Sequence, residues 1–266
     1  MRVLILGAGG MLGHKLWQVF CQRFDAYATV RKGYQEYESY NLFDLDRLFV
    51  NIDALDFDVI TSVIKELKPH VVMNCIGVIK QLPTARDPVV AIEINALFPH
   101  RLAKLCNASG IRLIHFSTDC VFSGNSGNYN EEDDPDPLDM YGRSKLIGEV
   151  STDGSLTLRT SIIGRELGSQ TGLLEWFLAQ EGTSVQGYSN AVFSGFTTQA
   201  LAIIMGDIVD SDKNITGLYH LSSEAINKHD LLVKLKELLG LDIEIEPYEE
   251  YHCDRSLDST KLRNLM

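Results

Sequence analysis

Sequence patterning predicts an α/β fold, a doubly wound parallel sheet of the Rossmann type. Short apolar runs alternate with stretches of helical periodicity from residue 3 to residue 163. Most of these runs are continuously apolar, which is typical of strands buried on both faces. A glycine-rich turn follows the first run and opens the first helical stretch. Together these three observations favour a parallel sheet with helices on both faces.

The elements of the sheet follow one another in order along the chain. We predict strands at residues 3–6, 26–30, 50–52, 71–76, 112–116 and 156–163, and helices at residues 11–24, 58–67, 89–109 and 141–150. The helix at 58–67 stops before Pro69, and the helix at 89–109 ends at Gly110, a favoured C-terminal cap. Residues 125–139 are rich in Gly, Asn, Asp and Pro, and predict an exposed loop.

The alternation loosens after residue 165. Helical patterns at 173–180, 198–208 and 228–239 surround one strand-like run at 217–221. We therefore expect residues 1–165 to form the Rossmann domain, which also takes back part of 190–210. Residues 166–266 are expected to form a small C-terminal lobe, interleaved with the last elements of the sheet, that binds the substrate.

Composition excludes several classes of protein. A net charge of −12 and a pI near 5.0 argue against a nucleic-acid or anionic-membrane surface. The five cysteines are odd in number and form no CxxC pair, and the histidines have no zinc spacing, so we expect reduced thiols and no metal. The N-terminal apolar run is too short for a secretory signal, and no stretch is as long as a membrane span. These features predict a cytoplasmic protein, and a homodimer is compatible with them.

A glycine turn predicts a dinucleotide site. Gly7, Gly10 and Gly13 form GxxGxxG directly after the first strand. The first glycine allows a tight turn, the second lets the backbone approach a pyrophosphate, and the third permits close packing of helix on strand. The N-terminus of the helix that begins at Met11 and Leu12 offers free N–H groups to the phosphates. We expect these five residues to bind the cofactor.

The end of the second strand predicts the kind of dinucleotide. NAD sites carry an acidic residue there for the ribose hydroxyl, whereas this chain continues with Arg31 and Lys32. Two cations attract the 2′-phosphate of NADP(H). A solvent-exposed basic pair with no ligand is the alternative. Asp53, after the third predicted strand, is placed to meet the adenine ring.

A tyrosine and a lysine form a candidate catalytic pair. Tyr141 and Lys145 are four residues apart in YxxxK, so on a helix they share one face. A nearby ammonium stabilises a phenolate, and we expect Lys145 to lower the pKa of Tyr141. Thr118 follows the strand at 112–116 and puts a hydroxyl at the edge of the sheet where open α/β sheets bind ligands. Thr118 is preferred as the third catalytic group, and Ser117 is the alternative.

An ordered set of motifs resembles a known family. The motifs are GAGGMLG at 7–13, NCIG at 74–77, EIN at 93–95, STDCVFSG at 117–124, YGRSKLIGE at 141–149 and RSLDSTKL at 255–262. The chain looks like a dTDP-4-dehydrorhamnose reductase, a family of extended short-chain dehydrogenases/reductases, over nearly its whole length. The resemblance implies reduction by NADPH of the C4 ketone of a nucleotide-linked deoxysugar.

The resemblance also implies roles for individual residues. Thr118 would hydrogen-bond the ketone, Tyr141 would protonate the developing alkoxide, and Lys145 would tune Tyr141 and bind the nicotinamide ribose. Asn95 matches a family position whose role is structural or catalytic. The residues expected to face the nucleotide-sugar substrate are Val78, Lys80, Thr118, Asp119 and Arg255. Arg255 would hold the pyrophosphate, with a surface charge on the tail as the alternative.

Departures from the family leave the substrate and the activity open. Residues 78–88 read VIKQLPTARDP, where the rhamnose-pathway enzymes carry a more polar, acid-containing stretch, so the sugar can be N-acetylated or otherwise modified. An epimerase of the same superfamily is one alternative. A dehydratase is disfavoured because Thr118 is followed by Asp119 and Cys120 rather than by an Asp-Glu pair. A non-catalytic regulatory subunit, like the β subunit of methionine adenosyltransferase, is another.

Overall fold

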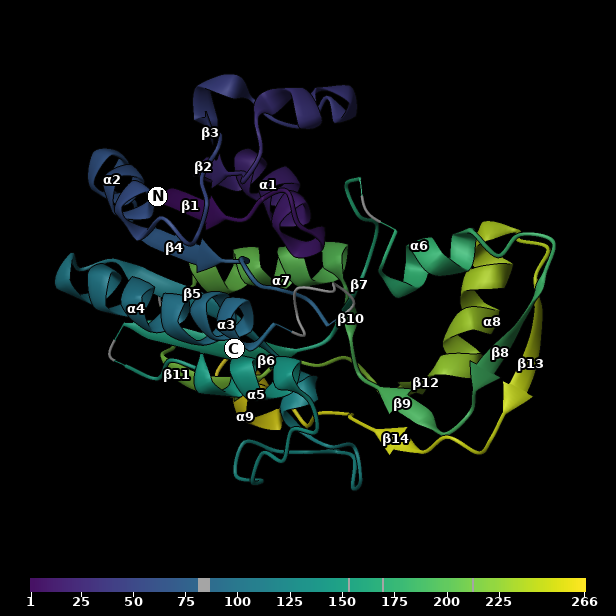
Figure 1. The fold of residues 1–266 in the computed structure, drawn as a ribbon. Helices are drawn as coiled ribbons and strands as arrows, with labels where there is room; N and C mark the ends of the chain where they lie inside the picture. Colours follow the sequence, from purple (N-terminus) through teal and green to yellow (C-terminus); the bar gives the residue numbers. More distant parts are fainter. Residues whose placement is uncertain (81–86, 153, 169, 212) are drawn as a thin grey trace.

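A seven-stranded, all-parallel sheet forms the centre of the molecule (Figure 1). The computed structural model describes residues 1–80, 87–152, 154–168, 170–211 and 213–266. The strand order is β11-β6-β5-β4-β1-β2-β3. The strands are β1 (Arg2–Leu6), β2 (Asp25–Thr29), β3 (Leu48–Phe49), β4 (Val71–Asn74), β5 (Arg112–Thr118), β6 (Ser155–Thr160) and β11 (Gly217–His220). The order reverses between β1 and β4, which places a ligand-binding crevice at their carboxyl ends.

Helices cover both faces of this sheet. One face is covered by α1 (Met11–Arg23) and α7 (Thr198–Asp210), which pack on each other and share a core that includes Leu16, Phe20 and Met205. The other face is covered by α2 (Phe57–Leu67) and α4 (Phe98–Ala108), together with α3 (Pro88–Ala91) and α5 (Met140–Ile147) (Figure 1). The predicted fold class is therefore confirmed.

A smaller lobe lies beside the carboxyl ends of the strands (Figure 1). Its helices are α6 (Leu173–Leu178) and α8 (Lys228–Leu239). Its strands are β8 (Ser184–Tyr188) paired with β13 (Glu244–Tyr248), and β9 (Ala191–Phe193) paired with β12 (Ile226–Asn227) and β14 (Cys253–Asp254). Two further short strands, β7 (Ile162–Ile163) and β10 (Phe196–Thr197), connect this lobe to the sheet, and α9 (Thr260–Arg263) packs back on β11.

Several local expectations differ from the structure. The third strand is Leu48–Phe49, so the prediction at 50–52 was wrong; Asn51 has a positive φ of 58°, which ends the strand. The helix predicted at 89–109 contains a π-helical turn, Ile92–Leu97. The helix that carries Tyr141 ends at Ile147. The short strands of the lobe were not predicted. The domain division at residue 165 stays a prediction. Of the later elements, α7 packs on α1 and β11 pairs with β6 in the central sheet.

The loop at 125–139 is exposed along most of its length, and Tyr129 is its one buried residue. Tyr129 is 6% exposed and stacks on Phe122, with ring centroids 4.1 Å apart. It also forms an isolated parallel bridge with Leu257 of the C-terminal segment. The expectation of a fully exposed loop was therefore wrong at this point, because an aromatic side chain anchors the loop.

Candidate active site

The glycine turn has the geometry of a phosphate-binding loop. Gly7 has a φ of 81°, which glycine adopts without strain. A Cβ at Gly13 would overlap the carbonyl oxygen of Gly7, so α1 can approach β1 only with glycine there. A Cβ at Gly10 would meet only that oxygen, at 3.4 Å, so protein packing does not require glycine at position 10. The turn is fixed from β2, because the N–H of Ala8 donates to the carbonyl of Thr29 at 2.8 Å.

The first turn of α1 leaves its backbone N–H groups available. No side chain caps the helix at Gly10, and its first turn contains no acidic residue. Leu12 is buried in the core, so it offers only its backbone at the turn. The Met11 side chain reaches toward Gly172 in the second part of the chain, where a Cβ would lie 2.8 Å from Cε. The turn can therefore hold an anion through backbone groups alone.

The two cations after β2 are exposed. Arg31 has a solvent-exposed side chain, and Lys32 forms an exposed ion pair with Glu36, 3.1 Å between Nζ and Oε2. No carboxylate lies in the Thr29–Lys32 stretch where an NAD site carries one. Burial raises the pKa of Tyr37, and the charges of Arg31 and Lys32 act in the opposite direction. Arg31 is available for a ligand, whereas Lys32 already has a partner.

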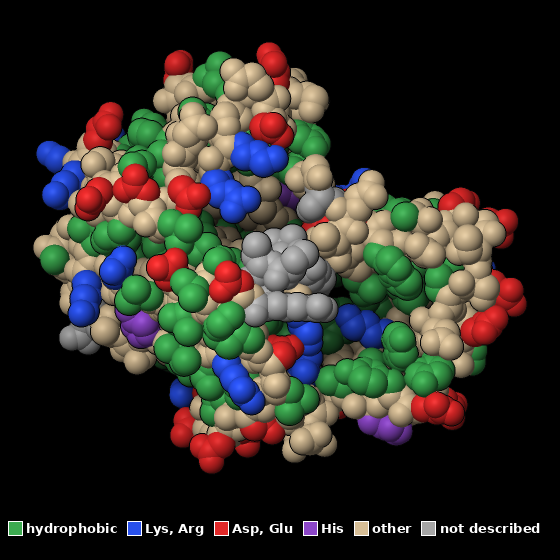
Figure 2. Space-filling model, in the orientation of Figure 1, with side chains coloured by type: hydrophobic (Ala, Val, Ile, Leu, Met, Phe, Trp, Pro, Cys, Tyr) green, Lys and Arg blue, Asp and Glu red, His purple; other side chains and the backbone are tan. Residues whose placement is uncertain are grey.

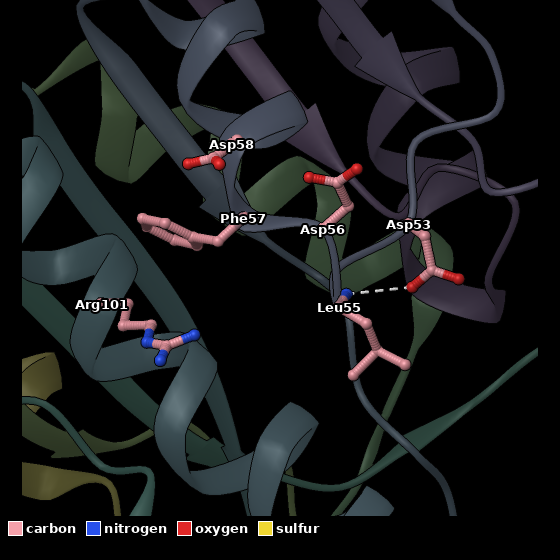
Figure 3. Close-up of a pocket in the computed structure, with 6 residues that line it drawn as sticks. All are labelled: Asp53, Leu55, Asp56, Phe57, Asp58 and Arg101. Atoms are coloured by element: carbon pink, nitrogen blue, oxygen red, sulfur yellow. Dashed lines mark hydrogen bonds between the residues drawn. The ribbon is translucent and has the colours of Figure 1, made fainter.

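Asp53 lies in a turn that leads into α2. Its Oδ1 accepts a hydrogen bond from the N–H of Leu55 at 3.0 Å. Figure 3 shows it at the rim of a surface hollow whose other lining residues are Leu55, Asp56, Phe57, Asp58 and Arg101. The hollow shares no lining residue with the catalytic candidates. The contact of Asp53 with an adenine ring stays a prediction.

Thr118 lies at the carboxyl end of β5 with its hydroxyl near Tyr141. Thr118 Oγ1 donates to Asp119 Oδ1 at 3.1 Å and accepts from the N–H of Cys120 at 3.1 Å. The Ser117 hydroxyl is instead committed to Glu149 Oε1, at 2.7 Å. Both hydroxyls donate to a carboxylate, but the Thr118 hydroxyl also acts on the phenol of Tyr141, which favours Thr118 over Ser117 as a group that can face a substrate.

Tyr141 and Lys145 project from α5, whose first turn is capped by the Asp139 carboxylate. Burial raises the pKa of Tyr141, with contributions from Cys120, Asp119 and Asp139, while the Thr118 hydroxyl acts in the opposite direction. Burial lowers the pKa of Lys145 to about 8, and its Nζ donates to the carbonyl of Phe116 on β5 at 2.6 Å. The expected lowering of the Tyr141 pKa is therefore not found, because the burial of the phenol outweighs the effect of the Thr118 hydroxyl.

Asn95 lies in the π-helical turn and connects two parts of the site. Its Oδ1 accepts from the N–H of Val78 at 2.9 Å, and its Nδ2 donates to the carbonyl of Val78 at 3.0 Å. Nδ2 also lies 3.2 Å from Ser144 Oγ on α5. The Val78 side chain is buried in an apolar cluster with Ile94, so only the backbone of Val78 makes polar contacts, and these go to Asn95. These contacts support the structural alternative for Asn95, and its role stays a prediction.

Three cations gather around Cys120. Lys80 forms an ion pair with Asp139, 2.7 Å between Nζ and Oδ2. Arg255 donates to the carbonyls of Phe122 at 2.9 Å and Ser123 at 3.4 Å. Lys228, at the start of α8, was missed by sequence reasoning; burial lowers its pKa, and the buried Asp119 opposes that effect. Figure 2 shows Lys and Arg side chains in a hollow between the sheet and the lobe.

The glycine turn and the catalytic helix are connected through the end of β4. A Cβ at Gly7 would lie 3.2 Å from the carbonyl carbon of Cys75, and the Lys145 ammonium acts on the Cys75 thiol. Residues 81–86, within the stretch that departs from the reductase pattern, lie outside the described residues. In the ranges that the structure describes, no cluster of three or more His, Cys, Asp or Glu could hold a metal, and no helix is long and apolar enough to cross a membrane.

The fold and the paired motifs define a Rossmann-type protein of the extended short-chain dehydrogenase/reductase class. A family model described as the RmlD substrate binding domain matches residues 1–257, and the chain belongs to that family. The resemblance to dTDP-4-dehydrorhamnose reductases is confirmed.

Relatives of known name fall into two groups. The chain is 28% identical over 254 residues to methionine adenosyltransferase 2 subunit beta of Danio rerio, covering 90% of this chain and 74% of the relative. It is also 28% identical over 254 residues to the probable low-salt glycan biosynthesis reductase Agl14 of Haloferax volcanii, covering 91% and 81%.

Solved structures show the same fold. The crystal structure of a hypothetical dTDP-4-dehydrorhamnose reductase from Sulfolobus tokodaii superposes with a TM-score of 0.84 at 27% identity, over 100% of this chain and 95% of that one. The dTDP-4-dehydrorhamnose reductase of Bacillus anthracis, solved with NADP, superposes with a TM-score of 0.81 at 21% identity, over 99% and 92%. The second similarity is evidence for the fold alone.

Proposed function

We propose that the chain is an NADP(H)-dependent reductase that converts the 4-keto group of a nucleotide-linked deoxysugar to an alcohol. The observation that carries the proposal is the convergence of the glycine turn with Thr118, Tyr141 and Lys145 at the carboxyl edge of the sheet. That edge is where open α/β sheets bind dinucleotides and their substrates. The unpaired cysteines fit a reducing compartment, so we propose that the enzyme acts in the cytoplasm.

The residues around the glycine turn fit NADP(H). Backbone N–H groups of α1 face the position where Gly10 leaves room for a pyrophosphate. The exposed Arg31 is available for a 2′-phosphate, and the Thr29–Lys32 stretch has no acidic residue that would repel that group. Bound NADPH supplies the hydride, and the protein supplies orientation and charge stabilisation.

Tyr141 is the proposed proton donor. Because burial raises its pKa, the phenol keeps its proton at neutral pH and can give it to the oxygen of the reduced ketone. The Thr118 hydroxyl, beside Tyr141, would hydrogen-bond the same oxygen, and Lys145 would bind the nicotinamide ribose.

A panel of nucleotide sugars tests the proposal. Purified full-length protein should oxidise NADPH with at least one 4-keto sugar nucleotide among dTDP-linked deoxysugars and N-acetylated analogues. Product identity would be read by mass spectrometry and NMR. NADPH binding with no turnover across the panel, with normal folding, would count against the reductase.

A regulatory subunit is the second candidate, because relatives named methionine adenosyltransferase 2 subunit beta match 90% of the chain. Such a protein would keep the fold and the glycine turn without turnover. Co-purification with a methionine adenosyltransferase, together with failure of the panel, would favour this function.

A further inference from the structure

A buried ion pair lies behind the catalytic candidates and takes no direct part in the proposed reaction. Arg159 on β6 donates from Nε to Glu149 Oε1 at 2.8 Å and from Nη2 to Oε2 at 2.9 Å. Only 4% of the Arg159 side chain and 11% of the Glu149 side chain are exposed. Two parallel hydrogen bonds of this kind fix the relative orientation of both groups. Burying such a pair costs desolvation free energy, so we asked which parts of the structure the pair connects.

The carboxylate of Glu149 connects the pair to two catalytic elements. Its Oε1 also accepts a hydrogen bond from Ser117 Oγ at 2.7 Å, directly before Thr118 on β5. Glu149 follows α5 one helical turn after Lys145, and its charge acts on the Lys145 ammonium. That ammonium is itself bonded to the carbonyl of Phe116 on β5. The end of β5 is therefore held to α5 at two successive places.

The guanidinium of Arg159 connects the pair to the loop that leads into α5. Its Nη1 lies 3.3 Å from His220 Nε2, and His220 Nδ1 lies 2.9 Å from the carbonyl of Tyr129. With the proton on Nδ1, His220 accepts from Arg159 and donates to Tyr129. The guanidinium also lies over the ring of Phe122, 5.2 Å from its centroid, and Phe122 stacks on Tyr129. One arginine thus holds both the segment after Thr118 and the loop before Tyr141.

We propose that Glu149 and Arg159 are positioning residues that fix the end of β5, helix α5 and the loop before it in the one arrangement that brings Thr118, Tyr141 and Lys145 together. This inference rests on the proposed function. Neither residue touches the reacting atoms; each acts through the elements it holds. The pair is formed by residues ten apart in the sequence, while its contacts reach β5, β11 and the loop at 125–139.

Glu149 has a second, electrostatic effect that a purely structural residue would lack. The charged or titratable groups that act on Lys145 or are acted on by it are Glu149, Cys75 and His115. Burial lowers the pKa of Lys145 to about 8, while Glu149 and Cys75 raise it. Without the Glu149 charge, Lys145 would lose its proton at a lower pH. The alkaline limb of any activity that needs the ammonium would then move to lower pH.

The experiment compares Glu149→Gln and Glu149→Asp with the wild type in the full-length protein. NADPH affinity is measured by nucleotide fluorescence between about pH 6 and pH 10, a range that spans the Lys145 titration, and kcat is measured with the substrate identified by the panel. Glu149→Gln should lower kcat about tenfold. It should also move the alkaline limb of NADPH binding to lower pH. Glu149→Asp keeps the charge, so it should restore the limb while kcat stays low.

A control at an exposed ion pair and a second variant keep the inference open to refutation. Asp207→Asn removes one of the two carboxylates that pair with Arg23, whose Nη1 lies 2.9 Å from Asp207, and should change neither kcat nor the limb. Arg159→Lys should lower kcat without moving the limb, and it supplies the test if Glu149→Gln does not fold. The inference would be overturned, and the reductase left intact, if Glu149→Gln changed neither kcat nor the alkaline limb. The same holds if Asp207→Asn unexpectedly lowered kcat and moved the limb as much as Glu149→Gln did. A wild type that binds no NADPH would instead overturn the proposed function itself.

Discussion

The two halves of the candidate site are built in opposite ways. The cofactor half is formed by the contiguous segment Gly7–Gly13, fixed by one neighbouring strand through Thr29. The substrate half gathers side chains from five separate stretches of the chain, namely Lys80, Asp119, Asp139, Lys228 and Arg255. Backbone geometry determines the first half, whereas tertiary packing determines the second. Substitutions should therefore act locally in one half and across several elements in the other.

The largest effect is expected in the substrate half, at Tyr141, on which Thr118 and Asp119 act. Tyr141→Phe removes the proposed proton donor and should lower kcat about 10²–10⁴-fold, the usual contribution of a general acid. NADPH affinity should stay within about twofold, because the phenol hydroxyl is not what holds the phosphates. The measurement is NADPH oxidation with the panel substrate beside a fluorescence titration. Tyr27→Phe on β2, far along the chain from the catalytic motifs, is the control and should keep full activity.

Two glycine substitutions test whether the cofactor half is local. Gly13→Ala would push a methyl group into the Gly7 carbonyl, and overpacking of this kind costs about 1–3 kcal/mol of unfolding free energy. Gly10→Ala meets only one atom, at 3.4 Å, so it should leave stability unchanged and weaken NADPH binding alone. Urea unfolding and fluorescence titration separate the two results. Equal destabilisation by both variants would show that position 10 is glycine for the sake of packing.

Arg31 sharpens the comparison because it adds charge selectivity to the local half. A charge-assisted hydrogen bond contributes about 1.5–3 kcal/mol, so Arg31→Ala should raise the NADPH Michaelis constant about tenfold or more and leave that for NADH unchanged. Lys32→Ala should have a smaller effect, since Lys32 is paired with Glu36. If NADH supports turnover as well as NADPH in the wild type, the preference for NADP(H) is wrong.

The smallest effect concerns acid stability, to which the buried histidines contribute. Burial lowers the pKa of His14 and His220 and, more strongly, that of His115. Their neutral forms stabilise the folded protein above about pH 6.5, the value of a free histidine, and this contribution is lost as the pH falls below it. Each can change stability by up to about 1.4 kcal/mol per pH unit.

Thermal unfolding between pH 7.5 and 5.5, a range of about two units around the free histidine pKa, measures this dependence. His220→Gln keeps one donor and one acceptor but does not titrate, so its midpoint should fall less steeply with acid than that of the wild type. The exposed His252→Gln should follow the wild type. A steeper fall for His220→Gln would contradict the assignment.

The same contrast explains how far the sequence could predict the molecule. The parallel sheet, the glycine turn and the Tyr141–Lys145 pair depend on local spacing, and all of them lie on elements close to those expected. Burial of the phenol reversed the expected pKa shift of Tyr141, because desolvation depends on packing that spacing does not reveal. The position of Lys228 and the contacts of the Glu149–Arg159 pair depend on tertiary packing, so no local sequence pattern predicts them. The short strands of the lobe escaped prediction because a run of two or three residues carries almost no periodicity.

The bridge between Tyr129 and Leu257 has a consequence for the order in which the protein matures. All three catalytic candidates are translated before residue 146, yet two later residues close the loop that leads to Tyr141. The N–H of Tyr129 donates to the carbonyl of Ser256 at 2.9 Å, and the N–H of Asp258 donates to the carbonyl of Tyr129 at 2.7 Å. Contacts between positions so remote in the chain form late in folding. A nascent chain on the ribosome can thus assemble its glycine turn early, whereas the loop before Tyr141 is closed only after residues 256–258 have emerged.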